Sequence, residues 1–438
     1  MTARLLDEAL VERIRIAVAA EVAEKTAASM ADGRRLDKAD QAALAGSLIE
    51  DHLERHARDC LARSEPAMSA AQERLLAEAV LNRIFHLARL QPMLDDERIM
   101  NIHANGHDVV FIEYADGTKA EGPPVAASDD EMIELLREIG RRHGLSEREF
   151  NPSHPQLNLQ LPDGSRLFAT AWVCARPCLA IRRHRYLKVT LADLEGMGTI
   201  EQGLSSLLGA AVRGRLQIVI GGPTGAGKTT MLRALASEIP PEERIVTIET
   251  ELELGLDRFP ELHPDCIALE AREANVEGVG LVTAADLVRM SLRMSPDRVA
   301  VGEVRGDEVV PMLNAMSQGN TGSISTIHSD SSSGVFRKLA LYAMQSPERL
   351  PMEATMLLAA AAIDLVIYIA KTPRGRFVSS VRQVTGFDGS QVVTNELYRP
   401  GRDGRARPGM PIPGDLLDKL VDAGYDPALH DNPEGWWR

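Results

Sequence analysis

The sequence predicts an α/β fold with a mainly parallel β-sheet, preceded by a smaller α+β domain and by an N-terminal helical segment. Three observations support this prediction. A glycine-rich turn, GGPTGAGKTT, occupies residues 221–230 between a buried-strand pattern and an amphipathic helix pattern. Strand-like and helix-like segments alternate from about residue 200 to about residue 400, as in parallel sheets covered on both faces. Residues 1 to about 90 have helical periodicity almost throughout.

These changes of pattern divide the chain into five segments. Between 91 and 190, short β-like runs at 99–103 and 109–114 alternate with glycine turn signals, and a helix pattern spans 130–142. We expect a helical extension at 1–90, an α+β domain at 91–190, a linker at 191–203, a P-loop domain at 204–400 and a Gly/Pro/Arg-rich tail at 401–438. Within the tail we expect 401–414 to be loosely ordered, followed by a short helix at 416–423.

Composition narrows the class of protein. The formal net charge of −14 disfavours indiscriminate attraction to nucleic acid or anionic lipid, although local basic patches remain possible. The four cysteines are too scattered for a disulfide framework, and Cys174 and Cys178 lack the second Cys/His pair of a zinc site. The N-terminus lacks the apolar core of a signal peptide, and the most apolar stretch, 356–370, is interrupted by Asp364. We therefore expect a cytoplasmic protein with reduced thiols.

The elements around and after the glycine-rich turn follow from periodicity. Residues 216–220 are a continuous apolar run, and Leu232, Leu235, Ala236 and Ile239 have helical spacing before Pro240-Pro241. Further along, Thr283 is an expected helix N-cap, and Asp364 separates a buried helix from a core strand. The expected strands are 244–249, 298–304, 323–328 and 365–370, and the expected helices are 283–294, 307–318, 334–344 and 357–363.

The turn itself fits the phosphate-binding motif G-x-x-x-x-G-K-[ST] from Gly222 to Thr229. Gly222, Gly225 and Gly227 are expected to let the backbone turn with positive φ and to bring its N–H groups against phosphate oxygens. The helix that follows directs its positive dipole end at the same anion. Lys228 can reach the β- and γ-phosphates, and the Thr229 hydroxyl can ligate Mg²⁺. We therefore expect ATP and Mg²⁺ to bind at Gly222, Pro223, Thr224, Gly225, Ala226, Gly227, Lys228, Thr229 and Thr230.

Carboxylates and a histidine end the neighbouring strands. A triphosphate hydrolase needs acidic groups to help hold Mg²⁺ and to polarise the attacking water. Glu249 ends one apolar strand and Glu303 ends another, and a surface-loop acid is the alternative interpretation for each. His328 ends a third strand, where it is either a structural histidine or a sensor of the γ-phosphate. We expect Glu249, Glu303, His328 and Arg305 at the catalytic site, with Thr229 and Glu303 on the metal.

A basic run, Arg182-Arg183-His184-Arg185, stands out in this acidic chain. Solvated surface charge is one explanation. The other is contact with phosphates bound elsewhere, since four potentially cationic side chains in succession repel one another unless something negative is near. On the second reading, at least one of Arg182 and Arg183 contacts bound phosphate.

With these residues identified, the chain resembles the secretion ATPase superfamily of type II and type IV secretion and pilus assembly. It is most similar to the tight-adherence pilus branch, the CpaF/TadA-like ATPases. The similarity spans most of residues 90–390. Its motifs are a GGTGSGKTT-like loop at 221–230, an Asp box, TIED-x-x-EL, at 247–254, LRM-x-PDR-x-x-VGEVRG at 292–306 and a His box, GH-x-GS-x-x-TIH, at 319–328.

The resemblance implies a RecA-like P-loop ATPase in which Glu249 is the general base, Glu303 the Walker B acid and His328 the His-box residue. It also implies a homohexameric ring that docks on inner-membrane platform proteins of a pilus or secretion system, peripheral at the cytoplasmic face. In a ring of this family the N-terminal domain faces the nucleotide site, so the resemblance implies that Arg182 or Arg183 binds the γ-phosphate in trans and that Arg305 supports the interface. Two residues depart from the family pattern. Thr250 replaces the usual Asp of the Asp box, and Asn320 replaces the usual His. We nevertheless expect hydrolysis, at a rate that the Thr250 departure lowers.

Three other functions compete with an assembly motor. A small-molecule kinase shares the P-loop, but no lid-like arginine cluster follows the sheet. A nucleic-acid motor is disfavoured by the acidic balance and by aromatic residues at only 4%, too few for a stacking platform. We therefore expect no nucleic-acid partner. A nucleotide-regulated scaffold that does not hydrolyse ATP remains open because of Thr250.

Overall fold

The computed structural model describes residues 7–31, 36–85, 87–114, 116–143, 150–183, 188–272, 274, 278–319 and 321–431. The chain forms two compact units, residues 1–183 and 184–438. His184, Arg185, Asn320 and the terminal tryptophans Trp436 and Trp437 lie outside the described residues. Within the described ranges, none of the helices is both long and apolar enough to cross a membrane.

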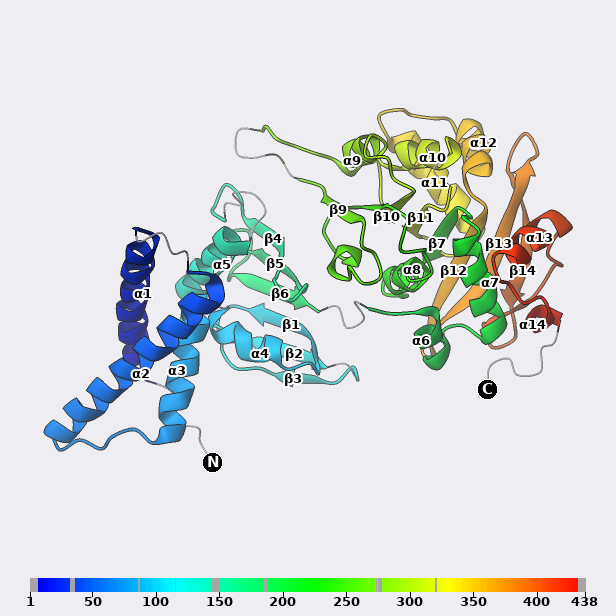
Figure 1. Ribbon diagram of the computed structural model, residues 1–438. Coiled ribbons are helices and arrows are strands. Elements are labelled where there is room, and N and C mark those ends of the chain that lie inside the picture. Colours follow the sequence, from blue (N-terminus) through cyan, green and yellow to red (C-terminus); the bar gives the residue numbers. More distant parts are fainter. Residues whose placement is uncertain are drawn as a thin grey trace. The chain divides into compact units, whose positions relative to one another are not determined.

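The first unit begins with three long helices, α1 (Glu8–Ala31), α2 (Lys38–Ala62) and α3 (Ala70–Phe85), drawn in blue in Figure 1. Asp37 caps α2 through a reciprocal capping box with Asp40, which explains the start of that helix. The three helices share a small apolar core that includes Val18, Ile49 and Val80, each fully buried. This core contains no residue of the sheet that follows.

A six-stranded antiparallel sheet completes the first unit, in the order β3-β2-β1-β6-β5-β4. Helix α5 packs against β4, and the sheet and helix residues Ile102, Leu136 and Leu167 are fully buried in one core. The elements are η1 (Ala88–Leu90), α4 (Gln91–Asp95), β1 (Ile99–Asn105), β2 (Val110–Tyr114), β3 (Lys119–Glu121), α5 (Asp129–His143), β4 (Gln156–Gln160), β5 (Arg166–Thr170) and β6 (Cys178–Arg182).

The second unit is built on a nine-stranded sheet in the order β15-β14-β13-β12-β7-β11-β10-β8-β9. Strands β12, β7, β11, β10, β8 and β9 run parallel, whereas β13, β14 and β15 add antiparallel pairings at one edge. The strands are β7 (Ile218–Gly222), β8 (Ile245–Glu249), β9 (Cys266–Glu270), β10 (Arg298–Val304), β11 (Ile324–His328), β12 (Leu365–Thr372), β13 (Gly375–Phe387), β14 (Val392–Pro400) and β15 (Ala406–Pro408).

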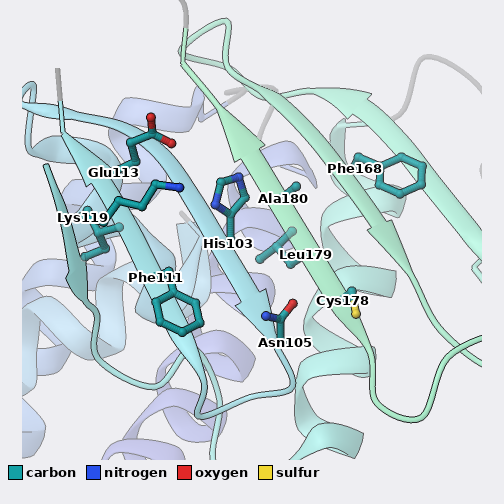
Figure 2. Close-up of a pocket in the computed structure, with 10 residues that line it drawn as sticks. His103, Asn105, Phe111, Glu113, Lys119, Phe168, Cys178, Leu179 and Ala180 are labelled. Carbon is teal, nitrogen blue, oxygen red and sulfur yellow. The ribbon is translucent and has the colours of Figure 1, made fainter. Parts of the chain in front are cut away.

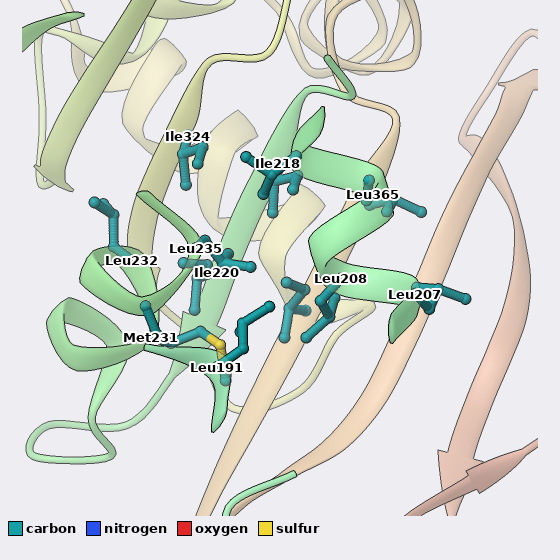
Figure 3. Close-up of a cluster of buried hydrophobic side chains, with 14 of the residues drawn as sticks. Leu191, Leu207, Leu208, Ile218, Ile220, Met231, Leu232, Leu235, Ile324 and Leu365 are labelled. Atoms are coloured by element: carbon teal, nitrogen blue, oxygen red, sulfur yellow. The ribbon is translucent and has the colours of Figure 1, made fainter. Parts of the chain in front are cut away.

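Helices cover both faces of this sheet because its central strands are apolar on both sides. Ile218 and Ile220 of β7 pack in one core, whereas Val219 packs in the other. The first core holds α6 (Leu191–Gly196), α7 (Gln202–Arg213), α8 (Lys228–Ala236) and α13 (Gly414–Asp422), and Figure 3 shows its centre. The second holds α9 (Ala284–Ser291), α10 (Val309–Ser317), α11 (Gly334–Gln345) and α12 (Met352–Ala362). The short η2 (Leu256–Arg258) and α14 (Ala428–Asp431) complete the described elements.

The segment 401–414 differs from the expectation of loose order. Residues Ala406–Pro408 form β15, which pairs with β14 in the same sheet, and Ala406 is fully buried. Arg405 stacks over the ring of Phe377 on β13, 5.5 Å from its centre. The glycine and proline residues of 401–414 therefore flank or end a short edge strand. The prediction of loose order is wrong for residues 406–408.

One buried arginine connects the beginning of β10 with the end of α7 and with the loops that contain Glu243 and Gly322. Arg298, at the beginning of β10, is only 1% exposed and forms a two-pronged ion pair with Glu243 at 2.7 and 3.0 Å. The same guanidinium donates to the carbonyl of Val212 at the end of α7 (2.8 Å) and to that of Gly322 (3.3 Å). A buried arginine needs this many partners because each unsatisfied donor would carry its full desolvation cost.

Candidate active site

The glycine-rich turn adopts the geometry that its sequence predicts, with one exception. It connects β7 to α8, and Gly225 (φ 70°) and Gly227 (φ 95°) have the left-handed backbone that only glycine adopts at low cost. Gly222 was also expected to have positive φ, but it does not. A Cβ on Gly222 would instead lie 2.7 Å from the carbonyl oxygen of Ile369 on β12. Glycine is needed there because two backbones approach each other.

Lys228 is the first residue of α8 and is only 7% exposed. Its Nζ lies 3.3 and 3.4 Å from the carbonyl oxygens of Gly222 and Pro223, and 3.1 Å from Nδ1 of His328. Burial lowers the pKa of Lys228, and the nearby carboxylate of Glu303, at 3.7 Å, opposes this effect. The ammonium group is thus held at the mouth of the turn.

Glu303 and His328 meet at this ammonium because β10 and β11 are neighbours and end at the same edge of the sheet. The Oε1 atom of Glu303 lies 2.6 Å from Nε2 of His328, and Oε2 accepts a hydrogen bond from Nε of Arg305. Burial lowers the pKa of His328, with Glu303 opposing and the Lys228 and Arg305 cations reinforcing the shift. Four residues that sequence patterns selected separately are therefore in one cluster.

Glu249 ends β8 in a more enclosed position, with only 4% of the residue exposed. Its Oε2 accepts hydrogen bonds from the N–H groups of Glu253 and Leu254, both at 2.8 Å. Its Oε1 is buried and has no hydrogen-bond partner among the residues that the structure describes. Burial raises the pKa of Glu249 to about 7, although the two N–H groups oppose the shift. The adjacent strand fits closely, since a Cβ on Gly302 would lie 2.9 Å from Cγ of Glu249.

Arg233, which the sequence analysis did not single out, supports this carboxylate. It lies on α8, is only 4% exposed, and donates from Nε to the carbonyl of Leu254 (2.9 Å) and from Nη2 to that of Glu253. The two residues whose N–H groups bind Glu249 are thus also bound by Arg233, through their carbonyl oxygens. No local sequence motif predicts this contact, because it joins residues about twenty positions apart.

The remaining predicted residues are less enclosed than Lys228 and Glu249. Thr229 is half-buried and Thr224 is exposed, as is Thr250, which follows Glu249. Arg182, at the end of β6, is exposed. Arg183 donates from Nη1 to the carbonyl of Asp96 at 2.6 Å, a contact within the first unit. The described part of the basic run therefore offers Arg182 as its free cation.

No group of three or more His, Cys, Asp or Glu side chains gathers as a metal site within the described ranges. The oxygen donors near the P-loop are the Thr229 hydroxyl and the Glu303 carboxylate, which suit Mg²⁺ in kind. With so few protein ligands, phosphate and water oxygens would have to complete an octahedral shell. The residues fit a magnesium ion that arrives with a nucleotide.

A pocket of about 550 Å³ lies in the first unit, on the six-stranded sheet. Figure 2 shows its lining, with His103 on β1, Phe111 and Glu113 on β2, Phe168 on β5 and Cys178 on β6. It contains none of the predicted site residues, which lie in the second unit apart from Arg182 and Arg183 of the basic run.

Comparisons with known proteins agree with the motifs. A family model described as type II/IV secretion system protein matches residues 96–406. A putative conjugal transfer protein of Mycobacterium tuberculosis is 33% identical over 297 residues, which cover 66% of this chain and 81% of the relative. The type IV secretion system protein VirB11 of Brucella suis is 32% identical over 328 residues, which cover 68% of this chain and 89% of the relative.

Among solved structures, the ATPase DotB of Legionella pneumophila is similar, with 19% identity and a TM-score of 0.50 over 67% of this chain and 79% of that chain. At this identity the likeness concerns the fold. The RecA-like α/β fold with a preceding α+β domain is confirmed, and so is the resemblance to secretion ATPases. The tight-adherence branch stays a prediction.

Replacing Arg233 with Met should loosen the turn that holds Glu249, because the carbonyls of Glu253 and Leu254 lose their donors. We expect hydrogen exchange of the peptide covering 250–256 to accelerate roughly tenfold, the equivalent of about 1.4 kcal/mol of local stability. Arg298→Met is the matched control, since it also removes a buried arginine but at the other end of the sheet. Equal exchange of 250–256 in both variants would contradict the assigned role.

The buried carboxyl group also predicts a pH-dependent stability. Burial raises the folded-state pKa of Glu249 to about 7, above the ordinary glutamate value of 4.5. The contribution of this carboxyl group to the free energy of unfolding is therefore fully present below about pH 4.5. It is lost as the pH rises to about 7, because the carboxyl group then ionises in the folded state as well. The melting temperature of Glu249→Gln relative to the original protein should rise between pH 5 and pH 8, measured by differential scanning calorimetry. A constant difference across this range would contradict the raised pKa.

Proposed function

This chain belongs to the family of type II/IV secretion system proteins, and from that premise we propose that it hydrolyses ATP to power assembly of a pilus or a secretion machine. The observation that carries the proposal is the convergence of Lys228, Glu303 and His328 at the mouth of the glycine-rich turn. Glu249 ends a strand at the same edge of the sheet, and its buried Oε1 has no hydrogen-bond partner within the described part of the chain.

Each residue has a distinct task in this proposal. Lys228 and the N–H groups of the turn bind the phosphates, and His328 is placed to respond to the γ-phosphate through its contacts with Lys228 and Glu303. Glu249 accepts the proton of the attacking water on Oε1, and a pKa near 7 suits a general base that works near neutral pH. Its other oxygen remains fixed by the N–H groups of Glu253 and Leu254.

Thr229 and Glu303 would hold Mg²⁺, which supplies charge neutralisation on the phosphates. Glu303 would have a second role besides holding the metal, because its carboxylate also contacts Lys228, His328 and Arg305. Phosphate oxygens that bind Lys228 would free part of this carboxylate for the metal.

We further propose that the protein works as a homohexamer at the cytoplasmic face of the inner membrane, docked on platform proteins. The support is membership of the family and the names of the relatives, one a VirB11 type IV secretion system protein and one a conjugal transfer protein. The tight-adherence pilus is the system we propose, on the motif resemblance. A nucleotide-regulated scaffold is the alternative, which Thr250 favours because it removes one charge from the Asp box.

The proposal predicts magnesium-dependent ATPase activity that fails in three single variants. Lys228→Ala should abolish turnover and weaken ATP binding strongly, because a charge-assisted phosphate contact is lost. Glu249→Gln and Glu303→Gln should suppress turnover at least tenfold while retaining ATP binding. Turnover is measured by phosphate release and binding by calorimetry. Binding without hydrolysis in the original protein would favour the scaffold, and activity in Lys228→Ala would exclude the proposed site.

Arg182 provides a test of action between subunits. If it contacts the γ-phosphate bound to a neighbouring subunit, Arg182→Ala alone should lower turnover on the order of 10³-fold. Mixing it with Lys228→Ala subunits should restore activity, because each subunit supplies what the other lacks. Arg183→Ala is the control, since its guanidinium is engaged by the carbonyl of Asp96. Full activity of Arg182→Ala alone would leave Arg182 as solvated surface charge.

A further inference from the structure

Two cations face each other on the hairpin formed by β12 and β13. Lys371 lies near the end of β12 and is the direct cross-strand partner of Arg376, near the start of β13. Both side chains are exposed, and neither has a hydrogen-bond or ion-pair partner among the residues that the structure describes. Like charges directly opposite each other destabilise an antiparallel pair. The arrangement needs a compensating negative charge.

This hairpin ends beside the phosphate-binding turn. Strand β12 runs parallel to β7, with Tyr368 opposite Gly221, so that its last residues extend past the end of β7 alongside the turn. The Nζ of Lys371 lies 3.2 Å from the position that a Cβ on Gly225 would occupy, and Cδ of Arg376 lies 4.0 Å from the corresponding position on Gly227. The two cations therefore lie next to Gly225 and Gly227, the glycines of the phosphate-binding turn that have positive φ.

The other cation of β13 is compensated by a carboxylate. Arg382, further along β13, forms an ion pair with Glu396 at 3.0 Å and donates to the hydroxyl of Ser332 at 2.7 Å. The contrast is informative, because the chain carries more acidic than basic residues and could have supplied a partner. The uncompensated pair lies where the P-loop would place a polyanion.

We propose that Lys371 and Arg376 are nucleotide-binding residues that contact the polyphosphate chain of ATP or ADP from the β12–β13 hairpin. The inference rests on the proposed function, because it requires a nucleotide at the P-loop. It adds two phosphate ligands that lie more than 140 residues after the motif. It also explains why a like-charged pair persists at this position: the bound phosphates supply the missing negative charge.

The test is the affinity for MgADP, measured by calorimetry on the full-length protein. Lys371→Gln and Arg376→Gln should each weaken binding about tenfold, and the double variant more. Arg374→Gln is the matched control, because Arg374 is an exposed cation in the turn of the same hairpin and is not among the atoms nearest either glycine. It should bind MgADP like the original protein.

A second measurement separates binding from folding. Without nucleotide, Lys371→Gln should melt at the same temperature as the original protein or higher, because charge repulsion in the pair is relieved. The increase in melting temperature that MgADP produces should be smaller. Unchanged affinity in both hairpin variants, or equal losses in Arg374→Gln, would overturn the inference. A smaller oligomer with unchanged affinity would also overturn it and would assign the pair to contacts between subunits.

These outcomes distinguish the inference from the proposed function. If the original protein binds no MgADP, or if Lys228→Ala binds it equally well, the nucleotide site itself is wrong. If binding depends on Lys228 but not on Lys371 or Arg376, only the role of the hairpin is wrong.

Discussion

The placement of a buried ammonium group at the carboxyl edge of a parallel sheet organises the second unit. Lys228 is withdrawn from water at the start of α8, so carbonyl, imidazole and carboxylate groups must lie close to it. Parallel strands deliver these groups together, since β7, β11 and β10 are adjacent and end at the same edge. The two apolar cores on either face keep the strands in register, so that a site of charged groups depends on the packing of uncharged ones.

A second carboxylate, Glu249, is treated differently by the fold. Glu303 stays partly exposed among cations, whereas Glu249 is enclosed and keeps a raised pKa. The difference arises from the turn after β8, which donates two N–H groups to one carboxylate oxygen, while the other oxygen has no hydrogen-bond partner among the described residues. Because Arg233 on α8 holds that turn, the helix that presents Lys228 also positions the carboxylate. One rigid element thereby sets the geometry of both groups.

The sequence predicted residues that occupy regular positions and missed those that depend on long-range contacts. Glu249 and His328 could be selected because each ends an apolar strand, and Glu303 because it lies one residue before the end of another. Thr283 could be selected because it precedes a helix. Arg233 and Lys371 carry no comparable signal, since their importance comes from neighbours brought close by folding. The sequence predicted a positive φ for Gly222, whereas glycine is needed there because the carbonyl oxygen of Ile369 on β12 lies close to it. That approach depends on how the strands pair. The strand at 406–408 was missed for the same cause.

The separate apolar cores of the first unit have an evolutionary consequence. The helices α1, α2 and α3 bury their side chains among themselves, and the sheet that follows has its own core from Leu87 to Ile181. The two parts are joined by polar contacts such as the ion pair between Arg89 and Glu8. A substitution inside one core therefore needs no compensating change in the other. The extension can diverge, or be exchanged for another helical segment, while residues 96–406 retain the constraints that define the family.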